Sequence, residues 1–404
     1  MNFTDIKYKA NYYVLLMMAF VIPLERKLIA PLIILFFVTC LFNFEFKPKK
    51  KATILLFSII YIIYIIGLLY SDDLKTGFFD ITTKLSLIIF PISFFIAKLD
   101  FNGILNNTLK SFIEGCFVSV VIALISSSIN FYFSFDTSLF FYGGAALFMH
   151  SSYFAMLLSL CLVVLYYFLL TKNPTFKQKT ILFLIILFST NILLLSSKTG
   201  LITMLLVHSI AISIWVIKYK AFVKGTVVLL LLIISFFVTY QYSSLFKQRV
   251  NELATVSRTD QSEISSTSTR KFIWITSFHL IKNNPIIGYG TGDAKNILVT
   301  EYQKEGMEFF HDEKLNAHNQ FFQTTLAIGL IGGVILILML IIPIIIALKN
   351  NYIIYLGFLI IISINFLTEA MLERQVGVVF YAFFNSLFFV SYYSKYSMKN
   401  DKQV

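Results

Sequence analysis

The sequence predicts an all-α integral membrane protein with about twelve transmembrane helices. Hydrophobic residues make up 58% of the 404 residues and charged residues only 13%, and the mean hydropathy is +0.80. A soluble chain carries about 25% charged residues, so this chain has too few charges to cover a surface that faces water. The apolar residues form long continuous runs and do not alternate with polar ones, which argues against a β-barrel.

A helix that crosses the bilayer needs about 20 mostly apolar residues. Such runs are found near residues 11–24, 28–44, 53–70, 84–98, 111–133, 145–170, 181–196, 199–217, 221–240, 318–347, 352–367 and 376–394. We therefore predict an N-terminal transmembrane bundle of about nine spans at 1–240, a loop at 241–317, and a C-terminal bundle of about three spans at 318–404.

Lysine and arginine residues are distributed unevenly between the two predicted sides of the membrane. Most of them lie in the short segments on the side that holds both termini, for example in 47–51, 172–179 and 218–224. The positive-inside rule, which counts short segments, therefore predicts that both termini are cytoplasmic. The long loop 241–317, predicted to contain short helices, then faces the opposite compartment.

Two other function classes are excluded at this stage. The net charge of +12 does not indicate nucleic-acid binding, because the basic residues form short clusters between apolar runs and no continuous stripe. The three cysteines, Cys40, Cys116 and Cys161, lie inside apolar runs without CxxC spacing. We predict that they pack against neighbours or face lipid and have no redox role.

The first motif lies in the long loop, where residues 270–292 read RKFIWITSFHLIKNNPIIGYGTG. Four larger side chains recur there at helical spacing: Arg270, Trp274, Phe278 and Ile281. This aromatic-rich pattern predicts a helix at the membrane surface that ends at 283–285. Gly288, Gly290 and Gly292 then alternate, a pattern that lets backbone amides approach a ligand closely.

The second motif opens the tenth predicted span, where residues 316–333 read NAHNQFFQTTLAIGLIGG. Asn316 is predicted to be the N-cap of this helix, with His318 and Asn319 in its first turn. The N-terminal end of a helix has free amide groups and partial positive charge, so this position suits an anion.

In combination, R-x3-W, P-x2-G-x-G-x-G, H-N-x-F-x-Q and a glycine-rich helix resemble the O-antigen ligase and O-antigen polymerase superfamily. Weaker similarity extends to Tyr70-Ser71 with Lys84 and Pro91, to Ser196-Ser197-Lys198, and to 368–374. The resemblance implies a GT-C-like glycosyltransferase of the bacterial inner membrane with a periplasmic catalytic loop. Its donor would be a glycan on polyprenyl diphosphate, and its acceptor lipid A–core for a ligase or another glycan for a polymerase.

The resemblance also implies roles for individual residues. An inverting displacement without metal or cofactor would use His318 as the base, while Arg270 and Lys198 hold the diphosphate. The expected substrate-binding residues are Asn319, Gly288, Gly290, Gly292, Trp274, Gln323, Lys84, Glu369, Glu373 and Arg374. One departure is that Lys198 stands where the family usually has arginine, and lysine lacks the bidentate guanidinium fork.

Several alternatives remain open from the sequence. His318 could serve only the helix start, Arg270 and Lys198 could anchor the chain at the interface, and His311 is a second candidate base. Glu369 and Glu373 are four residues apart, so one helical face could carry both and orient an arginine or bind the acceptor. A lipid-linked sugar transporter and a non-catalytic assembly factor are the alternative classes of function; a ligase is preferred to a polymerase.

Overall fold

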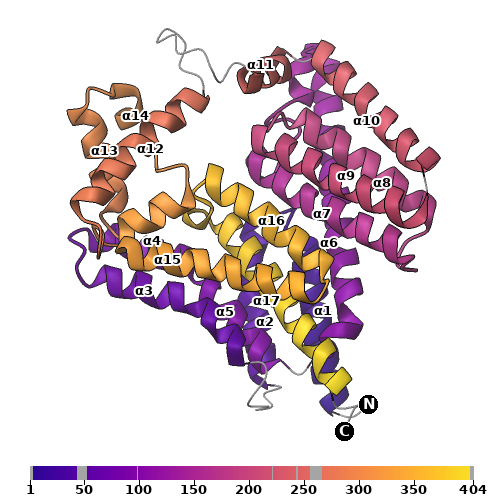
Figure 1. The fold of residues 1–404 in the computed structure, drawn as a ribbon, viewed down its shortest axis with the longest axis horizontal. Coiled ribbons are helices and arrows are strands. Elements are labelled where there is room, and N and C mark those ends of the chain that lie inside the picture. Colours follow the sequence, from indigo (N-terminus) through magenta and orange to yellow (C-terminus); the bar gives the residue numbers. More distant parts are fainter. Residues whose placement is uncertain are drawn as a thin grey trace. The chain divides into compact units, whose positions relative to one another are not determined.

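The structure is a computed structural model that describes residues 3–42, 52–97, 99–220, 222–242, 244–254 and 266–400. Within these ranges the regular secondary structure is helical, with no strand (Figure 1). The predicted all-α class is therefore confirmed. Parts of two predicted segments, 43–51 and 255–265, lie outside the described residues.

The helices follow one another along the chain with short connections. The first group is α1 (Phe3–Val21), α2 (Arg26–Phe42), η1 (Ala52–Ser58), α3 (Ile59–Leu68), α4 (Leu74–Lys84), α5 (Ser86–Ile96) and α6 (Phe101–Ser134). The second is η2 (Thr137–Phe140), α7 (Ser151–Thr171), α8 (Gln178–Leu194), α9 (Lys198–Tyr219) and α10 (Phe222–Tyr242). The predicted long loop holds α11 (Ser244–Ala254), α12 (Ser266–Asn283), α13 (Ala294–Lys304) and α14 (Glu308–Asp312). The chain ends with α15 (Gln320–Lys349), α16 (Ile353–Thr368), η3 (Met371–Glu373) and α17 (Gln375–Asn400).

Six helical segments of the described chain are long and apolar enough to cross a membrane: Leu74–Ile96, Gly103–Ser134, Ser151–Thr171, Lys198–Ile217, Gln320–Lys349 and Gln375–Tyr393. Shorter apolar helices cover Lys27–Phe42, Ile54–Leu68, Gln178–Leu194, Leu229–Tyr242 and Ile353–Thr368. Each predicted span overlaps a helix, but the number of about twelve stays a prediction because the shorter helices do not meet the length of a full span.

One boundary differs clearly from the prediction. The predicted span at 84–98 left residues 74–83 outside any helix, whereas α4 begins at Leu74 and leads almost directly into α5. The local cause is a capped helix start, because the Asp73 side chain accepts a hydrogen bond from the Thr76 amide (2.9 Å). Because the first turn of α4 contains polar residues, α4 was not part of the predicted apolar run.

The chain folds into two compact units. One unit is formed by 1–11, 33–102 and 260–404, and the other by 12–32 and 103–259. Each unit is therefore assembled from segments distant in sequence, whereas the predicted division followed the chain in order.

The core of the first unit is rich in phenylalanine. Phe383 of α17 lies 5.5 Å from Phe90 and 5.9 Å from Phe94 of α5, measured between ring centroids. Phe358 of α16 packs against Phe384 and other rings of α17. Edge-on and tilted packing of this kind adds to the burial of each ring and holds α5, α16 and α17 together.

The second unit is built around α7, whose residues are almost all buried against α8 and α9. His208 lies in its interior, where the ring accepts or donates hydrogen bonds to Tyr166 (2.8 Å) and Ser189 (3.0 Å). Cys116 and Cys161 are fully buried in this unit, and Cys40 is buried in the first. The cysteines are thus packing residues and do not face lipid.

Candidate functional site

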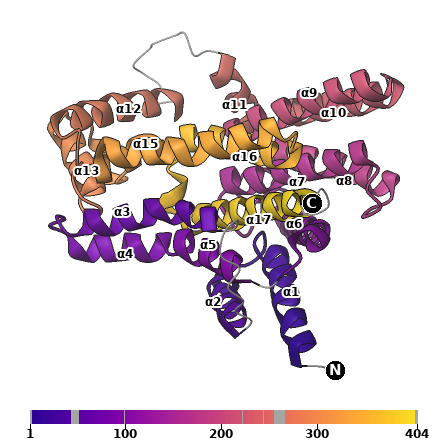
Figure 2. The same cartoon turned by 60° about the horizontal axis from the view of Figure 1, so that its bottom comes forward.

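Three segments of the first unit meet at the candidate site. Arg270 lies on α12, His318 immediately precedes α15, and Glu369 is the C-cap residue of α16. Helix α12 packs against α15, and α15 packs against α16, as Figure 2 shows. The fold therefore brings together polar residues that lie about a hundred positions apart.

Glu369 connects two of the three residues predicted to be catalytic, Arg270 and His318. Its Oε1 accepts a hydrogen bond from Arg270 Nη2 at 2.8 Å, and its Oε2 lies 3.3 Å from His318 Nδ1. The side chains of Arg270, Glu369 and His318 are 22%, 17% and 28% exposed, so the group is sheltered but reachable from outside. We call this group the Arg–Glu–His cluster.

The backbone at His318 corrects the predicted helix start. His318 has a φ of +42°, in the left-handed region, and therefore cannot be part of the first helical turn. The N-cap is Asn319, whose Oδ1 accepts from the amides of Phe321 and Phe322. The prediction that Asn316 caps the helix is wrong; its Oδ1 instead accepts from the His318 amide at 3.0 Å and stabilises the turn.

Three residues predicted to bind substrate lie around this turn. The Gln323 Oε1 accepts from the Ala317 amide at 3.1 Å, and Asn319 Nδ2 donates to the Leu367 carbonyl. Trp274 of α12 contacts Phe322 with ring centroids 6.2 Å apart. In this structure these side chains fix the backbone on which His318 is presented.

Lys84 belongs to a second polar cluster, in which its own side chain is fully buried and the two carboxylates are mostly buried. Its Nζ lies 2.6 Å from Asp80 Oδ2 and 2.9 Å from Glu373 Oε1, and 4.7 Å from the centre of the Tyr64 ring. Burial, together with the nearby Asp80 carboxylate, raises the pKa of Glu373 to about 7, while Lys84 opposes the rise. With two carboxylates around it, Lys84 is held inside the protein; we call this group the Lys84 cluster.

Glu369 and Glu373 do not share a helical face. Helix α16 ends at Thr368, and Glu369 has an extended backbone with a φ of −145°. The prediction of a shared face is therefore wrong, because the helix stops before the first glutamate. Glu369 contacts the Arg–Glu–His cluster and Glu373 the Lys84 cluster, while Arg374 is exposed. Of the two glutamates, it is Glu369 that contacts an arginine.

Gln320 links the two clusters. Its Oε1 accepts from the Leu372 amide at 2.6 Å, and its Nε2 donates to Thr324 Oγ1, which in turn is hydrogen-bonded to the Tyr64 hydroxyl. These contacts hold the segment that carries Glu369 and Glu373. Gln320, Asp80 and Tyr64 were not predicted from the sequence, where the i, i+4 spacing of Asp80 and Lys84 was the one usable signal.

The glycine-rich segment fills a break in α15. The helix is interrupted at Ile328 and at Gly329, where φ is +70°. The carbonyls of Leu326 and Ala327 then accept from the amides of Tyr289 (2.8 Å) and Gly290 (2.9 Å). Backbone groups inside a membrane protein must be satisfied in this way when a helix is broken.

The same segment also leaves little room for side chains. A Cβ at Gly290 would meet Ser71, and one at Gly292 would meet the Asp73 carbonyl. The amides of Thr291 and Gly292 donate to the Gly67 carbonyl and Ser71 Oγ. The amides of Gly290, Thr291 and Gly292 therefore bind protein acceptors, and the role of the three glycines in substrate binding stays a prediction.

Lys198 belongs to the second unit, at the first position of α9. It is 9% exposed, and the preceding Ser197 caps the helix by accepting from the Gly200 amide. Its expected role beside Arg270 stays a prediction.

The remaining histidines have other surroundings. His311 is paired with the neighbouring Asp312, His150 caps α7 and contacts Tyr142, and His279 is exposed on α12. His318 is the histidine that the described structure places beside an arginine and a carboxylate.

Residues 181–337 match the model of the O-antigen ligase family. This match supports the superfamily indicated by the motifs and covers Lys198, Arg270, the glycine-rich segment and His318. Lys84 and Glu369 lie outside it. No curated protein matches the chain. Together, the match and the apolar helices indicate a multi-pass membrane protein.

Proposed function

Proceeding from the O-antigen ligase match, we propose that this protein is a glycosyltransferase of the bacterial inner membrane. It transfers a glycan from polyprenyl diphosphate to an acceptor hydroxyl at the periplasmic face, and for a ligase this acceptor is lipid A–core. The observation that carries the proposal is the Arg–Glu–His cluster, which joins a base to a cation in one sheltered site.

The reaction requires a base for the acceptor hydroxyl. When Nδ1 of His318 donates to Glu369, the proton resides on Nδ1 and Nε2 has a free lone pair. Nε2 then takes the hydroxyl proton while the acceptor oxygen bonds to the anomeric carbon from the face opposite the leaving group. Glu369 stabilises the resulting imidazolium, as the carboxylate does in other carboxylate–histidine pairs.

The reaction also requires positive charge at the leaving group. As the bond between the anomeric carbon and the diphosphate oxygen breaks, its electron pair passes to polyprenyl diphosphate. Arg270 of the Arg–Glu–His cluster stabilises this developing charge, and we assign Lys198 the same task. This scheme balances without a metal or an organic cofactor.

The other predicted residues are assigned according to their contacts. Asn319, Gln323 and Trp274 position the His318 turn, and the glycines allow the segment 288–292 to pack into α15. Lys84 and Glu373 act on Glu369 through the connecting segment. Arg374, which is exposed, is the member of this set best placed to contact a substrate directly.

The test is transfer in vitro from a purified lipid-linked glycan to its acceptor. His318→Ala is expected to lower the rate by about 10²- to 10⁴-fold, the usual contribution of a general base. His279→Ala, which removes an exposed histidine from α12, is the matched control and should retain the wild-type rate. A His318→Ala enzyme of unchanged rate would contradict the proposal and favour a non-catalytic assembly factor.

A polymerase of the same superfamily is the second candidate, because the match of residues 181–337 and the chemistry apply equally to both. The surface glycans of a strain that lacks this protein distinguish a ligase from a polymerase. Unattached lipid-linked polymer indicates a ligase, and attached single repeats indicate a polymerase.

A transporter of lipid-linked sugars would need coupling to an energy source or exchange. Transfer in detergent, without nucleotide or an ion gradient, would exclude that class, whereas movement of the carrier without a new glycosidic bond would support it.

A further inference from the structure

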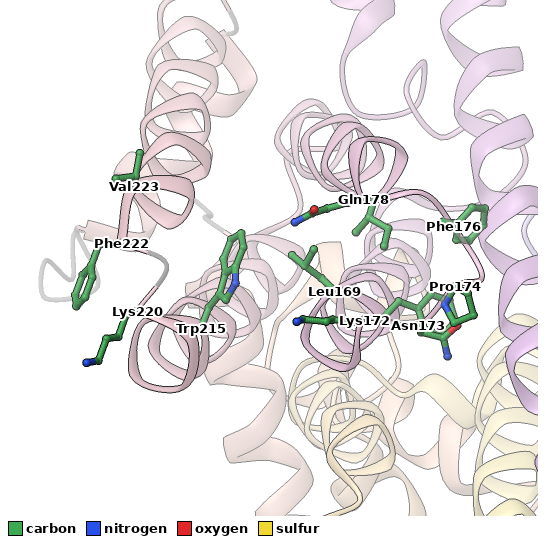
Figure 3. Close-up of a pocket in the computed structure, with 12 residues that line it drawn as sticks. Leu169, Lys172, Asn173, Pro174, Phe176, Gln178, Trp215, Lys220, Phe222 and Val223 are labelled. Carbon is green, nitrogen blue, oxygen red and sulfur yellow. The ribbon is translucent and has the colours of Figure 1, made fainter.

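A cavity of about 660 Å³ lies in the second unit, and none of the motif residues discussed above lines it (Figure 3). It is lined by the last residues of α7 and α9 and the first residues of α8 and α10. In a multi-pass protein, such a meeting of helix ends marks the depth of the lipid headgroups.

The inner wall of the cavity is apolar. Phe168, Ile181 and Trp215 line it and are 0%, 2% and 6% exposed, so they form a fixed surface. An indole ring beside polar groups is typical of the membrane interface. This wall fits an acyl chain or glycerol backbone better than a fully hydrated ion.

Two lysines form the polar part of the lining. Lys172 follows α7 and Lys220 follows α9, and both are exposed. Neither has an ion-pair partner within the part of the chain that the structure describes. Lys172 and Lys220 therefore provide positive charge next to the apolar wall of the cavity. This combination suits a ligand that has an anionic group and an apolar part.

The charge on the two segments that line the cavity has one sign. Every charged residue in 171–180 and in 217–226 is a lysine. Elsewhere in this unit, the Glu114 carboxylate lies 3.7 Å from Lys110, whose Nζ is 5.8 Å from the ring centre of the lining residue Phe176, so this carboxylate already has a lysine partner. Between Glu114 and Glu252 the sequence has a single acidic residue, Asp136, which precedes the opposite end of α7. Helix α7 is about 30 Å long at 1.5 Å per residue, so this carboxylate is too distant to neutralise the lysines.

The start of α8 adds neutral donors. Gln178, its first residue, lines the cavity, and the preceding Lys177 makes no side-chain cap. The first amides of an uncapped helix have no intrahelical acceptor and can donate to an anion.

We propose that this cavity binds the phosphate headgroup of an anionic phospholipid. Lys172 and Lys220 contact the phosphate, and the lipid's apolar part lies against Trp215 and Phe168. The site is independent of the proposed transfer reaction, since all its residues belong to the second unit and none is assigned a role in that reaction.

The first test is lipid binding by the full-length protein in detergent, measured by native mass spectrometry. Phosphatidylglycerol and phosphatidylcholine of equal chain length are titrated separately. Each lysine is expected to contribute about five-fold to the affinity for phosphatidylglycerol. The double variant Lys172→Gln/Lys220→Gln should therefore bind this lipid about 30-fold more weakly. The matched control Lys177→Gln/Lys179→Gln removes the same charge at the start of α8, close in sequence to Lys172, at positions that do not line the cavity. Its affinity should change by less than about five-fold.

The second test uses the fluorescence of Trp215 and does not depend on the lysine variants folding. The chain has two tryptophans, so Trp274→Phe leaves Trp215 as the single reporter. Brominated phosphatidylglycerol should quench Trp215 at concentrations at which brominated phosphatidylcholine does not. Equal quenching by both lipids, equal losses in the two double variants, or binding of inorganic phosphate as tight as that of phosphatidylglycerol would each overturn the proposal.

Discussion

At the scale of single residues, the site depends on Glu369. This carboxylate is the one group in the described structure that contacts both Arg270 and His318. Its two oxygens face different partners, so its position fixes the distance between the proposed base and the proposed phosphate-binding cation. Because Glu369 orients both Arg270 and His318, its replacement is expected to lower the transfer rate even though Glu369 itself is not assigned a substrate contact.

Glu369→Gln removes the charge and keeps the shape of the side chain. We expect the transfer rate to fall by about 10²-fold or more, because the imidazolium formed on His318 loses its counter-charge. The rates of the wild type, Glu369→Gln and the exposed control Glu313→Gln are compared in the same assay. Partial recovery in Glu369→Asp would support a positioning role; a rate equal to that of Glu313→Gln would contradict it.

Lys84→Met tests the buried Lys84 cluster. The substitution leaves Asp80 and Glu373 next to each other inside the protein without a cation, which costs about 3–5 kcal/mol of unfolding free energy. Thermal unfolding in detergent measures the effect, with Lys75→Met as the control on an exposed position of the same helix. Equal melting temperatures for the two variants would show that Lys84 does not hold the cluster together.

At the scale of elements, the break in α15 connects this apolar helix to the glycine-rich segment that follows α12. The Pro285 carbonyl accepts from the Leu330 amide on one side of the break, and Leu326 and Ala327 accept from the glycine-rich segment on the other. This exchange of hydrogen bonds fixes the segment after α12, and therefore fixes α12 and Arg270 relative to α15.

Gly329→Ala tests this junction. The new Cβ would meet the Ile286 carbonyl, and the φ of +70° is unfavourable for alanine. Gly306→Ala is a close control, because Gly306 has a φ of +73° but open space around its Cβ position. We expect Gly306→Ala to cost about 1 kcal/mol and Gly329→Ala at least about 3 kcal/mol, with a loss of transfer activity. Equal costs in thermal unfolding would mean that the junction does not fix the segment.

Helix α12 presents an exposed apolar stripe, with Phe272, Ile275 and Phe278 each 45% exposed or more. The opposite side, with Ile273 and Leu280, is buried. A helix with two apolar sides fits the predicted location at the membrane surface, since one side packs on α15 and the other is left for lipid.

At the scale of the whole molecule, the orientation in the membrane remains a prediction from charge. Thr300→Cys, at an exposed position of α13, should react with an impermeant maleimide added to intact spheroplasts, whereas Lys177→Cys, between α7 and α8, should react only after lysis. The native cysteines are buried and give a low background. Labelling of residue 300 only after lysis would reverse the predicted orientation.

The all-α membrane class, the family that the motifs resemble, and the candidates His318 and Arg270 could all be predicted from the sequence. These depend on composition, on apolar runs and on residue order, all of which are local. The sequence analysis did not identify the local caps at Asp73 and Asn319, because α4 starts with a polar turn and two asparagines compete at the start of α15. The link that Gln320 makes to Leu372 could not be predicted, because it joins residues far apart in the chain.

The tertiary structure alone decided how the polar residues are grouped. It paired Glu369 with Arg270 and His318, and it enclosed Lys84 between Asp80 and Glu373. It also showed that the glycine-rich amides complete the broken α15. The physical reason is the same in each case: a buried charge or backbone group must find a partner, and only the packing of distant helices determines which partner is near.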